Sequence, residues 1–391
     1  MDRGLYDADH DAYRSTVREF FEREVVPNAE QWDADRLIDR TVFPTAAKQG
    51  VYALEVPAAY GGADVHDYRY RMVVNEEAAR VNAASLNLTF GLFDDIVLGY
   101  LADLTTEEQK QRWLPQFVTG ELVTAIGMTE PGAGSDLRGI RTTARRDGKD
   151  AIWILNGSKT FISSGTNADL VIVAARTESE AGGFSLFAVE AGMDGFERGR
   201  KLDKVGLHAQ DTAELFFNDV HIRAENLIGT EGRGLAHLMV NLPRERLGII
   251  ASAFAFARSV YELTHAYCFE RTAFGKRIGD LQHIRFVLAE IATELDVAEA
   301  YVDRCVRAFN AGTLTPVDAA KGKWYVSELQ TRTVDRCVQL HGGYGYMLEY
   351  PVARAFIDSR AQTIYGGTTE IMKEIIGRDL TPKPSHPRPS G

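Results

Sequence analysis

Cysteine is scarce in this 391-residue sequence, which holds only Cys268, Cys305 and Cys337, far apart along the chain. An odd number of cysteines without a C-x-x-C pair indicates neither a disulfide framework nor a thiolate metal site. The nine histidines form no cluster such as H-E-x-x-H. The sequence therefore predicts no metal centre, and three reduced thiols in the core of a cytoplasmic protein.

Positive charge is also in deficit, because 44 Lys and Arg residues stand against 55 Asp and Glu residues, a net charge of −11. This balance argues against nucleic acid or an anionic membrane as a partner, although a few arginines can still bind an anionic small molecule. No apolar run reaches the roughly 20 residues of a membrane span. The acidic start, M-D-R-G-L-Y-D-A-D-H-D, lacks the apolar core of a signal peptide. We expect a cytoplasmic protein, or a mitochondrial matrix protein if the chain is eukaryotic and already processed.

What the sequence does contain is a change of pattern at two points, and its length allows two or three domains. Residues 1–122 show the apolar spacing of helices, and T-T-E-E at 105–108 predicts a capped N-terminus for the helix that begins at Thr106. Residues 123–232 hold short β-rich runs separated by turns, which predicts an antiparallel sheet, as a small barrel or sandwich, rather than a Rossmann domain. Residues 233–380 are helical again, and a long apolar stripe predicts a four-helix bundle. Residues 381–391 are rich in proline and are predicted to be a disordered tail. The predicted fold class is α+β with several domains.

Five short motifs follow one another along the chain: M-T-E-P-G-A-G-S-D (128–136), N-G-S-K-T-F-I-S-S-G (156–165), E-R-T-A-F-G-K-R-I (270–278), Q-L-H-G-G-Y-G-Y (339–346) and I-Y-G-G-T-T-E (364–370). Taken singly, they are typical of turns, a hairpin, a solvated charge run and helix ends. The first suits a phosphate-bearing ligand, because its turn presents several backbone N–H groups. It is not a dinucleotide fingerprint, since G-x-G-x-x-G needs glycine where Leu137 stands and no βαβ unit follows. A nicotinamide site is therefore disfavoured.

Together and in this order, the motifs resemble those of the acyl-CoA dehydrogenase family, from about Tyr13 to Leu380. The likeness is greatest to the long-chain type, through A-Q-D-T-A-E-L-F-F, L-P-R-E-R-L and I-Y-G-G-T-T-E-I-M-K-E. The resemblance implies FAD-dependent α,β-dehydrogenation of a saturated acyl-CoA of medium to long chain to the trans-2-enoyl-CoA. It also implies electron transfer to an electron-transferring flavoprotein, a place in fatty acid β-oxidation, and a homotetramer built as a dimer of dimers.

The resemblance assigns binding residues as well, with FAD between the β domain and the C-terminal bundle. One set matches groups that line the flavin, a second matches groups that reach the FAD of a neighbouring subunit, and a third matches substrate contacts. The first set is Ile126, Met128, Thr129, Gly134, Ser135, Phe161, Ile162 and Ser163, the second is Arg271, Thr272, Phe274, Gln282, Gln339, Gly342 and Gly343, and the third is Ser135, Arg246 and Gly367. Thr368 and Glu370 match further FAD contacts.

The catalytic base is where this sequence departs from many family members. They carry a glutamate at the position of Gly366, where this chain supplies only a backbone N–H to the thioester carbonyl. The long-chain and isovaleryl types carry it at the position of Glu245, and we take Glu245 as the base. Without the family, a glutamate between two arginines is typical of a solvated charge run. Pro243 interrupts the helical pattern and predicts a kink that can aim Glu245 inward. Glu370 is the rival carboxylate.

Two alternatives stay open at this point. One is an acyl-CoA oxidase-like flavoenzyme, which gives its electrons to oxygen, although such oxidases usually carry an extra C-terminal domain. The other is a non-catalytic acyl-CoA- or flavin-binding protein that has lost its base.

Substrate preference in the family depends on a stretch that matches Ser85 to Tyr100. Gly91 and Gly99 leave room there for a long acyl chain. Asp94 and Asp95 lie in the same stretch and face either solvent, which is the commoner fate of aspartate, or the pocket. A pocket-facing carboxylate predicts an acyl chain with a polar or branched tail. The sequence does not distinguish CoA from an acyl carrier protein as the carrier.

Overall fold

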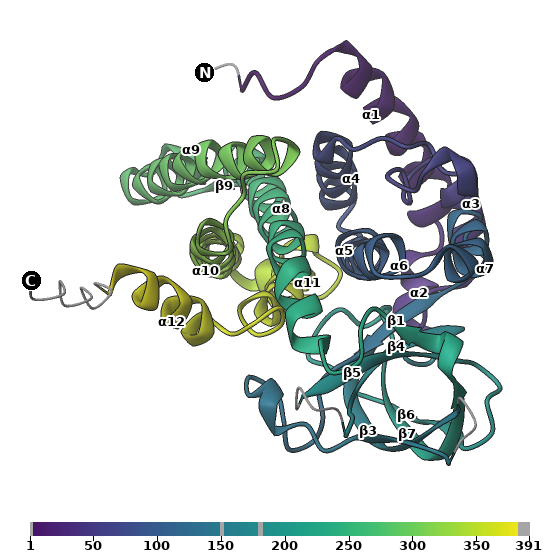
Figure 1. The fold of residues 1–391 in the computed structure, drawn as a ribbon. Helices are drawn as coiled ribbons and strands as arrows, with labels where there is room; N and C mark the ends of the chain where they lie inside the picture. Colours follow the sequence, from purple (N-terminus) through teal and green to yellow (C-terminus); the bar gives the residue numbers. More distant parts are fainter. Residues whose placement is uncertain (1–2, 149–151, 179–182, 382–391) are drawn as a thin grey trace, which may run out of the picture.

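The N-terminal part of the chain forms a layer of helices in the computed structural model, which describes residues 3–148, 152–178 and 183–381 (Figure 1). The predicted cap before α7 (Glu107–Val118) is confirmed, because Thr106 Oγ1 accepts from the Gln109 N–H and the Gln109 side chain accepts from the Thr106 N–H. The other helices of this layer are α1 (Ala8–Phe20), α2 (Ala29–Asp35), α3 (Val42–Lys48), α4 (Tyr68–Arg80), α5 (Ala84–Gly91) and α6 (Leu98–Asp103), with short segments η1 (Phe21–Val25) and η2 (Ala58–Tyr60).

A π-helical segment, η3 (Leu92–Val97), joins α5 to α6 without a break in the helix. Asp94 and Asp95 lie within it, and their exposed fractions are only 8% and 3%. π turns are rare and recur at functional sites. The solvent-facing alternative for the two aspartates is therefore wrong.

The middle of the chain forms a sheet that curls around its own core of Trp153, Phe187 and Phe217 (Figure 1). Its strands are β1 (Thr124–Gly127), β2 (Thr143–Arg146), β3 (Ile152–Ser163), β4 (Leu170–Arg176), β5 (Phe184–Glu190), β6 (Phe196–Lys201), β7 (Thr212–Arg223) and β8 (Leu227–Ile228), with short turns η4 (Leu137–Gly139) and η5 (Ala224–Asn226).

The sheet is mainly antiparallel, as predicted, in the strand order β6-β7-β3-β2-β4-β5-β8. It is nevertheless mixed, because β1 pairs with β4 in parallel and β2 joins β4 in parallel at Thr143 and Arg176. A parallel pair needs a long return connection. Residues 128–169, which carry β2 and β3, provide it between β1 and β4. The alternation of apolar and polar residues within a single strand does not predict this return connection.

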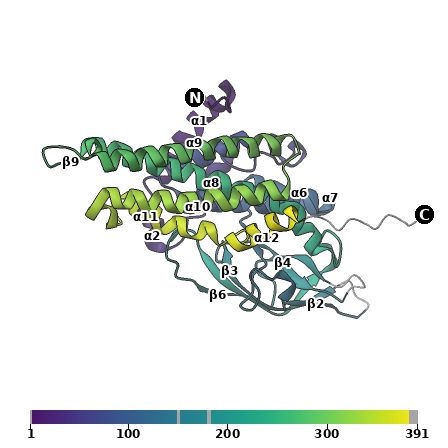
Figure 2. The same ribbon diagram turned by 90° about the vertical axis from the view of Figure 1, so that its left-hand side faces the viewer.

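Long helices make up the C-terminal part. Helices α8 (Gly234–Glu270), α9 (Gln282–Asn310) and α10 (Pro316–His341) run side by side, and α12 (Thr369–Leu380) packs on α10 (Figure 2). The predicted apolar stripe is confirmed on α9, where Ile291, Leu295 and Val302 are fully buried. The remaining elements are β9 (Thr272–Ala273), β10 (Lys276–Arg277), η6 (Ile278–Asp280), η7 (Gly342–Tyr346), α11 (Pro351–Ser359) and η8 (Arg360–Thr363). All three cysteines are buried free thiols.

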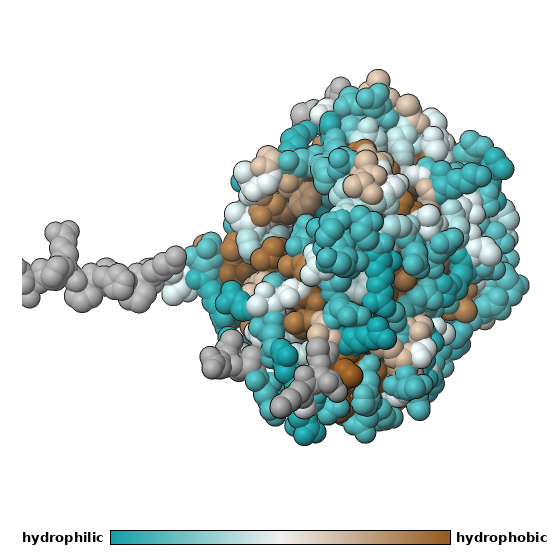
Figure 3. Space-filling model, turned by 45° about the vertical axis from the view of Figure 1, so that its right-hand side comes forward, coloured by the Kyte–Doolittle hydropathy of each residue, from teal (hydrophilic) through white to brown (hydrophobic). Residues whose placement is uncertain are grey.

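Among the described residues, α8 alone is long and apolar enough to cross a membrane by length and composition. However, 67% of its most apolar window is buried inside the protein, where α8 packs against α4 and α10. On the face shown in Figure 3, hydrophilic side chains predominate and hydrophobic ones gather mainly toward the left of the view. The burial of α8 is that of a core helix.

The predicted domain limits coincide with loops. The 122/123 limit lies between α7 and β1, and the 232/233 limit lies between β8 and α8. The predicted tail lies outside the described residues, apart from Thr381.

Candidate active site

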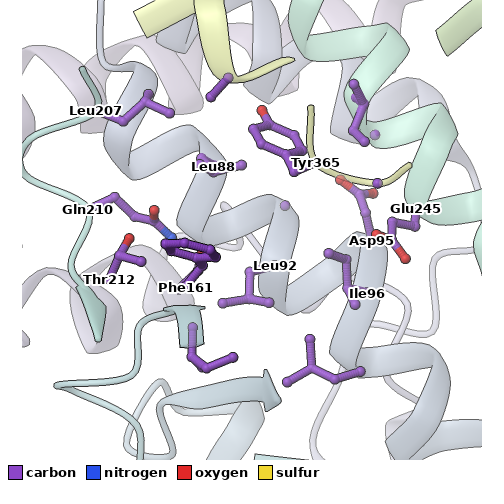
Figure 4. A pocket seen from close by; sticks show the side chains of 18 of the residues that line it. Leu88, Leu92, Asp95, Ile96, Phe161, Leu207, Gln210, Thr212, Glu245 and Tyr365 are labelled. Atoms are coloured by element: carbon purple, nitrogen blue, oxygen red, sulfur yellow. The ribbon is translucent and has the colours of Figure 1, made fainter. Parts of the chain in front are cut away.

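A cavity of about 560 Å³ lies where the N-terminal helices, the sheet, α8 and the glycine turn before α12 meet. Figure 4 shows Glu245 and Asp95 on one side of it, with Phe161, Gln210 and Thr212 on the other. Eight of the predicted site residues line this cavity although they come from widely separated motifs. They are Ile126, Met128, Thr129, Phe161, Ile162, Ser163, Glu245 and Gly366.

Glu245 lies in α8, two residues after Pro243, and only 8% of it is exposed. Its Oε2 atom has no hydrogen-bond partner among the described residues. Burial raises the pKa of Glu245 to about 7, and the charges of Arg246 and Lys323 offset part of that rise. A carboxylate with a pKa near neutrality is suited to accept a proton from a weak carbon acid.

The Gly366–Gly367 turn brings the backbone up to this carboxylate. Both glycines have positive φ, +64° and +94°, a conformation that side chains disfavour. A Cβ atom placed on Gly366 would lie 3.7 Å from Glu245 Oε1 and 2.3 Å from Ile249 Cδ1. A side chain at position 366 and the carboxylate of Glu245 therefore point to the same place, and here Ile249 fills the space that the side chain would need.

A buried lysine of α10 holds the turn in place. Lys323 has no exposed surface, and its Nζ donates to the Gly367 carbonyl at 2.6 Å. Burial lowers the pKa of Lys323 to about 8. No sequence motif singles out this residue, although its apolar, buried neighbours at helical spacing, Ala320 and Val326, indicate that it faces inward.

The opposite wall is built from the end of β1 and from β3. Phe161 has a positive φ of +59° and is 68% exposed, and it lies flat along the cavity in Figure 4. The loop that follows Met128 is fixed by a buried ion pair, since Lys159 Nζ lies 2.8 Å from Glu130 and also donates to the Met128 carbonyl. Glu130 in turn accepts the N–H groups of residues 141 and 142. This pair is a structural support that the sequence motifs contain but do not reveal.

Other predicted residues lie outside the cavity. Gly134 and Ser135 are exposed in the loop after Met128. Arg246 is buried beside Glu245 and does not line the cavity. Gly367 does not line it either, but its carbonyl accepts the hydrogen bond from Lys323 that holds the turn.

The predicted neighbour-facing set lies elsewhere again, near the hairpin β9–β10 at the far end of α8 and α9 (Figure 2). Arg271 stacks on the Tyr344 ring at 5.8 Å, which joins the hairpin to the glycine-rich end of α10. All members of the set are exposed: Arg271, Thr272, Phe274, Gln282, Gln339, Gly342 and Gly343.

Glu370, the rival base, is exposed in the first turn of α12, which Thr368 caps. Both residues line a separate, open pocket of about 520 Å³ together with Arg332 and Arg360. Neither faces the cavity of Glu245.

Three family models cover nearly the whole chain: the acyl-CoA dehydrogenase N-terminal domain matches residues 7–121, the middle domain 125–220 and the C-terminal domain 232–381. The chain belongs to the acyl-CoA dehydrogenase family. It is 45% identical to the mitochondrial long-chain specific acyl-CoA dehydrogenase of Sus scrofa, over 97% of this chain and 88% of that protein.

Solved structures agree with this assignment. An acyl-CoA dehydrogenase from Geobacillus kaustophilus superposes with a TM-score of 0.92 at 45% identity, covering 96% of this chain and 98% of that one. A structure described as the electron-transferring flavoprotein of Acidaminococcus fermentans gives 0.91 at 33% identity, covering 97% and 99%. The chain is thus a flavin-dependent oxidoreductase of this family, whose members use FAD.

The cavity fits a flavin of an acyl-CoA dehydrogenase. Phe161 offers an exposed flat ring, and Met128 and Thr129 border the same space. Gln210 also lines the cavity, and its buried Nε2 has no partner among the described residues. A planar, polar-edged ring system would cover the ring and satisfy the amide.

Proposed function

We propose that this chain dehydrogenates a medium- to long-chain acyl-CoA to the trans-2-enoyl-CoA, with Glu245 as the base. The observation that carries the proposal is the buried Oε2 atom of Glu245, which has no hydrogen-bond partner in the part of the chain that the structure describes and lies beside the backbone of Gly366. Family membership supplies the reaction class, and the long-chain relative supports the chain length.

In this proposal, Glu245 Oε2 accepts the α-proton of the thioester. The Gly366 N–H, which makes no hydrogen bond within the described part of the chain, donates to the thioester carbonyl as negative charge develops on its oxygen. Lys323 holds the turn that aims this N–H. Bound FAD supplies the acceptor for the β-hydrogen, which leaves as hydride. Leu88, Leu92 and Ile96 give the acyl chain an apolar wall that excludes water.

The roles of the remaining predicted residues belong to the same proposal. Met128, Thr129 and Phe161–Ser163 would hold the FAD of their own subunit, and the exposed set around Arg271 would reach the FAD of a neighbour in a homotetramer. An electron-transferring flavoprotein is the proposed acceptor, supported by the likeness to the Acidaminococcus structure. A place in β-oxidation and a cytoplasmic or matrix location stay predictions, although the pig relative is named as mitochondrial.

Anaerobic reduction of the bound flavin by a panel of saturated acyl-CoAs tests the proposal. The native protein should bleach with some chain lengths, and Glu245→Gln should hold FAD but bleach about a hundredfold to ten-thousandfold more slowly, since a positioned base contributes that much. Glu374→Gln is the matched control, because this exposed glutamate of α12 pairs with Arg378 and does not line the cavity. Glu370→Gln tests the rival base.

Three outcomes contradict the proposal in different ways. Equal bleaching by Glu245→Gln would remove Glu245 as the base. Bound FAD that no acyl-CoA reduces would favour the non-catalytic binding protein. Rapid oxygen consumption without an added acceptor would favour the oxidase.

A further inference from the structure

The cavity wall turns polar beyond Glu245 in the direction of the C-terminal end of α8. Glu245, Gly248 and Ser252 all line the cavity from α8. Gly248 and Ser252 lie three and seven residues further, which is about one and two helical turns, or roughly 5 and 11 Å along the axis. Asp95 and Asn87 line the cavity from the facing helix. An acyl chain that starts at Glu245 and runs along α8 therefore passes these groups.

A buried ion pair forms this part of the wall. Arg71 of α4 is 7% exposed, and its Nε lies 3.3 Å from Asp95 Oδ2. The Tyr68 hydroxyl donates to Asp95 Oδ1 at 2.9 Å. Two glycines make room for the pair, because a Cβ on Gly91 would lie 3.2 Å from Arg71 Nη2 and one on Gly248 would lie 2.5 Å from Asp95 Oδ2.

Arg71 and Ser252 keep unused hydrogen-bond donors at this wall. A guanidinium has five N–H groups, and Arg71 uses three within the described residues, one on Asp95 and two on the side-chain and backbone oxygens of Asn87. Two N–H groups remain. The Ser252 hydroxyl accepts from Asn87 Nδ2 at 3.2 Å and from Gln362 Nε2 at 3.4 Å, so its own O–H remains to donate.

Charge decides which acceptor suits these donors. The Asp95 carboxylate already balances Arg71, and Asp94 lies next to it in the chain, so a second anion would meet repulsion in a buried place. A carbonyl or hydroxyl oxygen accepts a hydrogen bond without adding charge. A purely hydrocarbon chain would instead leave buried donors unpaired, which is costly.

We propose that this chain takes acyl thioesters with a neutral oxygen, as a ketone or hydroxyl, one to two helical turns beyond the α-carbon, where Arg71 and Ser252 donate to it. This inference rests on the proposed function, since it takes the acyl chain to start at Glu245. It names a specificity site of that same cavity.

Matched substrates test it. Decanoyl-CoA is compared with positional isomers that carry a ketone or hydroxyl along the distal half of the chain, and with the dicarboxylic analogue that ends in a carboxylate. Two quantities are measured on the holoenzyme: kcat/KM for flavin reduction, and the dissociation constant of each corresponding 2-enoyl-CoA by calorimetry. At least one oxygenated isomer should exceed decanoyl-CoA about threefold to tenfold for each hydrogen bond gained, and the carboxylate should fall below both.

Variants assign the effect to the wall. Ser252→Ala should lower the preference for the oxygenated isomer about threefold to tenfold. The double variant Arg71→Met with Asp95→Leu removes both charges of the ion pair together, so that neither partner stays buried without the other, and it should abolish the preference. Ser259→Ala is the matched control, because Ser259 lies one heptad further on α8, outside this cavity, and donates to the Ala79 carbonyl. It should keep the native preference.

The two proposals fail separately. If acyl-CoAs reduce the flavin but no oxygenated isomer is preferred, or if Ser252→Ala leaves the preference unchanged, the specificity site is overturned and the proposed function stands. If no acyl-CoA reduces the flavin, the proposed function fails, and equal dissociation constants for oxygenated and plain enoyl-CoAs then overturn the specificity site as well.

Discussion

At the scale of single residues, the site depends on two buried charges that oppose each other. Glu245 has a raised pKa because it is buried, and Lys323 has a lowered pKa for the same reason. Each also counteracts the shift of the other, since opposite charges favour the ionised forms of both. Arg246 from the same helix adds a further positive charge, while Tyr100, which also faces Glu245, stays neutral because burial raises its pKa well above its usual value.

The first prediction concerns the pH dependence of flavin reduction. The carboxylate must be deprotonated to accept the α-proton, so the rate should rise with pH through about 7. Lys323→Met removes a positive charge that holds the pKa of Glu245 down, so the acidic limb of the pH–rate profile should move to higher pH by about one unit. Stopped-flow reduction at a series of pH values measures the limb.

Lys323→Arg is the control for charge. It keeps a cation at this place and should leave the limb near its native position, even if the rate itself changes. A lower rate with an unmoved limb in Lys323→Met would mean that the lysine acts only as a support for the Gly367 carbonyl.

At the scale of elements, the glycine turn and α8 are fitted to each other. Gly366 needs its positive φ, and the space beside its Cα belongs to Ile249. The turn can approach the helix because neither residue of the Gly-Gly pair has a side chain.

The second prediction follows from this contact. Gly366→Ala should destabilise the protein by about 1–3 kcal/mol, through backbone strain and the clash with Ile249, and should slow flavin reduction by moving the N–H. Adding Ile249→Ala relieves the clash but not the strain, so a double-mutant cycle in urea should show a favourable coupling between the two positions. Strict additivity would show that the turn moves away from α8 without meeting it.

Much of the architecture at this scale follows from local pattern. Helical spacing, the Thr106 cap and the α9 stripe were predicted because they depend on neighbouring residues. The parallel pairing of β1 with β4 was not, because pairing joins distant segments. Glu245 was found only through the family resemblance, since on sequence alone it resembles a solvated charge.

The burial of single polar groups could not be predicted from the sequence for a similar reason. Asp95 is inward because η3 packs against a glycine of α8 that lies about 150 positions later, and Lys323 is inward because the turn of α12 needs its ammonium. Each depends on a partner from another part of the chain, and periodicity within one helix cannot name that partner.

At the scale of the whole molecule, the predicted FAD-binding residues fall into two groups that lie in separate parts of the structure. One lines the cavity, and the other lies at the end of the bundle, where Phe274 is 92% exposed and Tyr346 is 84% exposed. Large exposed apolar side chains beside basic ones are typical of a contact surface. This separation supports the prediction that one FAD contacts two subunits.

The third prediction tests that arrangement. Arg271→Ala should lower the FAD content of the purified protein and its melting temperature at limiting FAD, although Arg271 is far from the Glu245 cavity. Light scattering should give a tetramer for the native protein. Arg378→Ala, which removes an exposed arginine paired with Glu374 on α12, is the control and should retain FAD. A monomeric protein that binds FAD fully would contradict the two-subunit site.

The π-helical segment η3 links the length of this helix to the substrate preference of the enzyme. One extra residue in the helical repeat separates α5 from α6. Loss of one residue from Leu92–Val97 would remove the wide turn and restore an ordinary α-helix, so that α5 and α6 keep their positions while the side chains between them shift by one place. Asp95 would then leave its place opposite Gly248, and an apolar residue would take it. If the proposed specificity site is correct, such a deletion replaces the polar part of the pocket wall by an apolar one and leaves Glu245 on α8 in place.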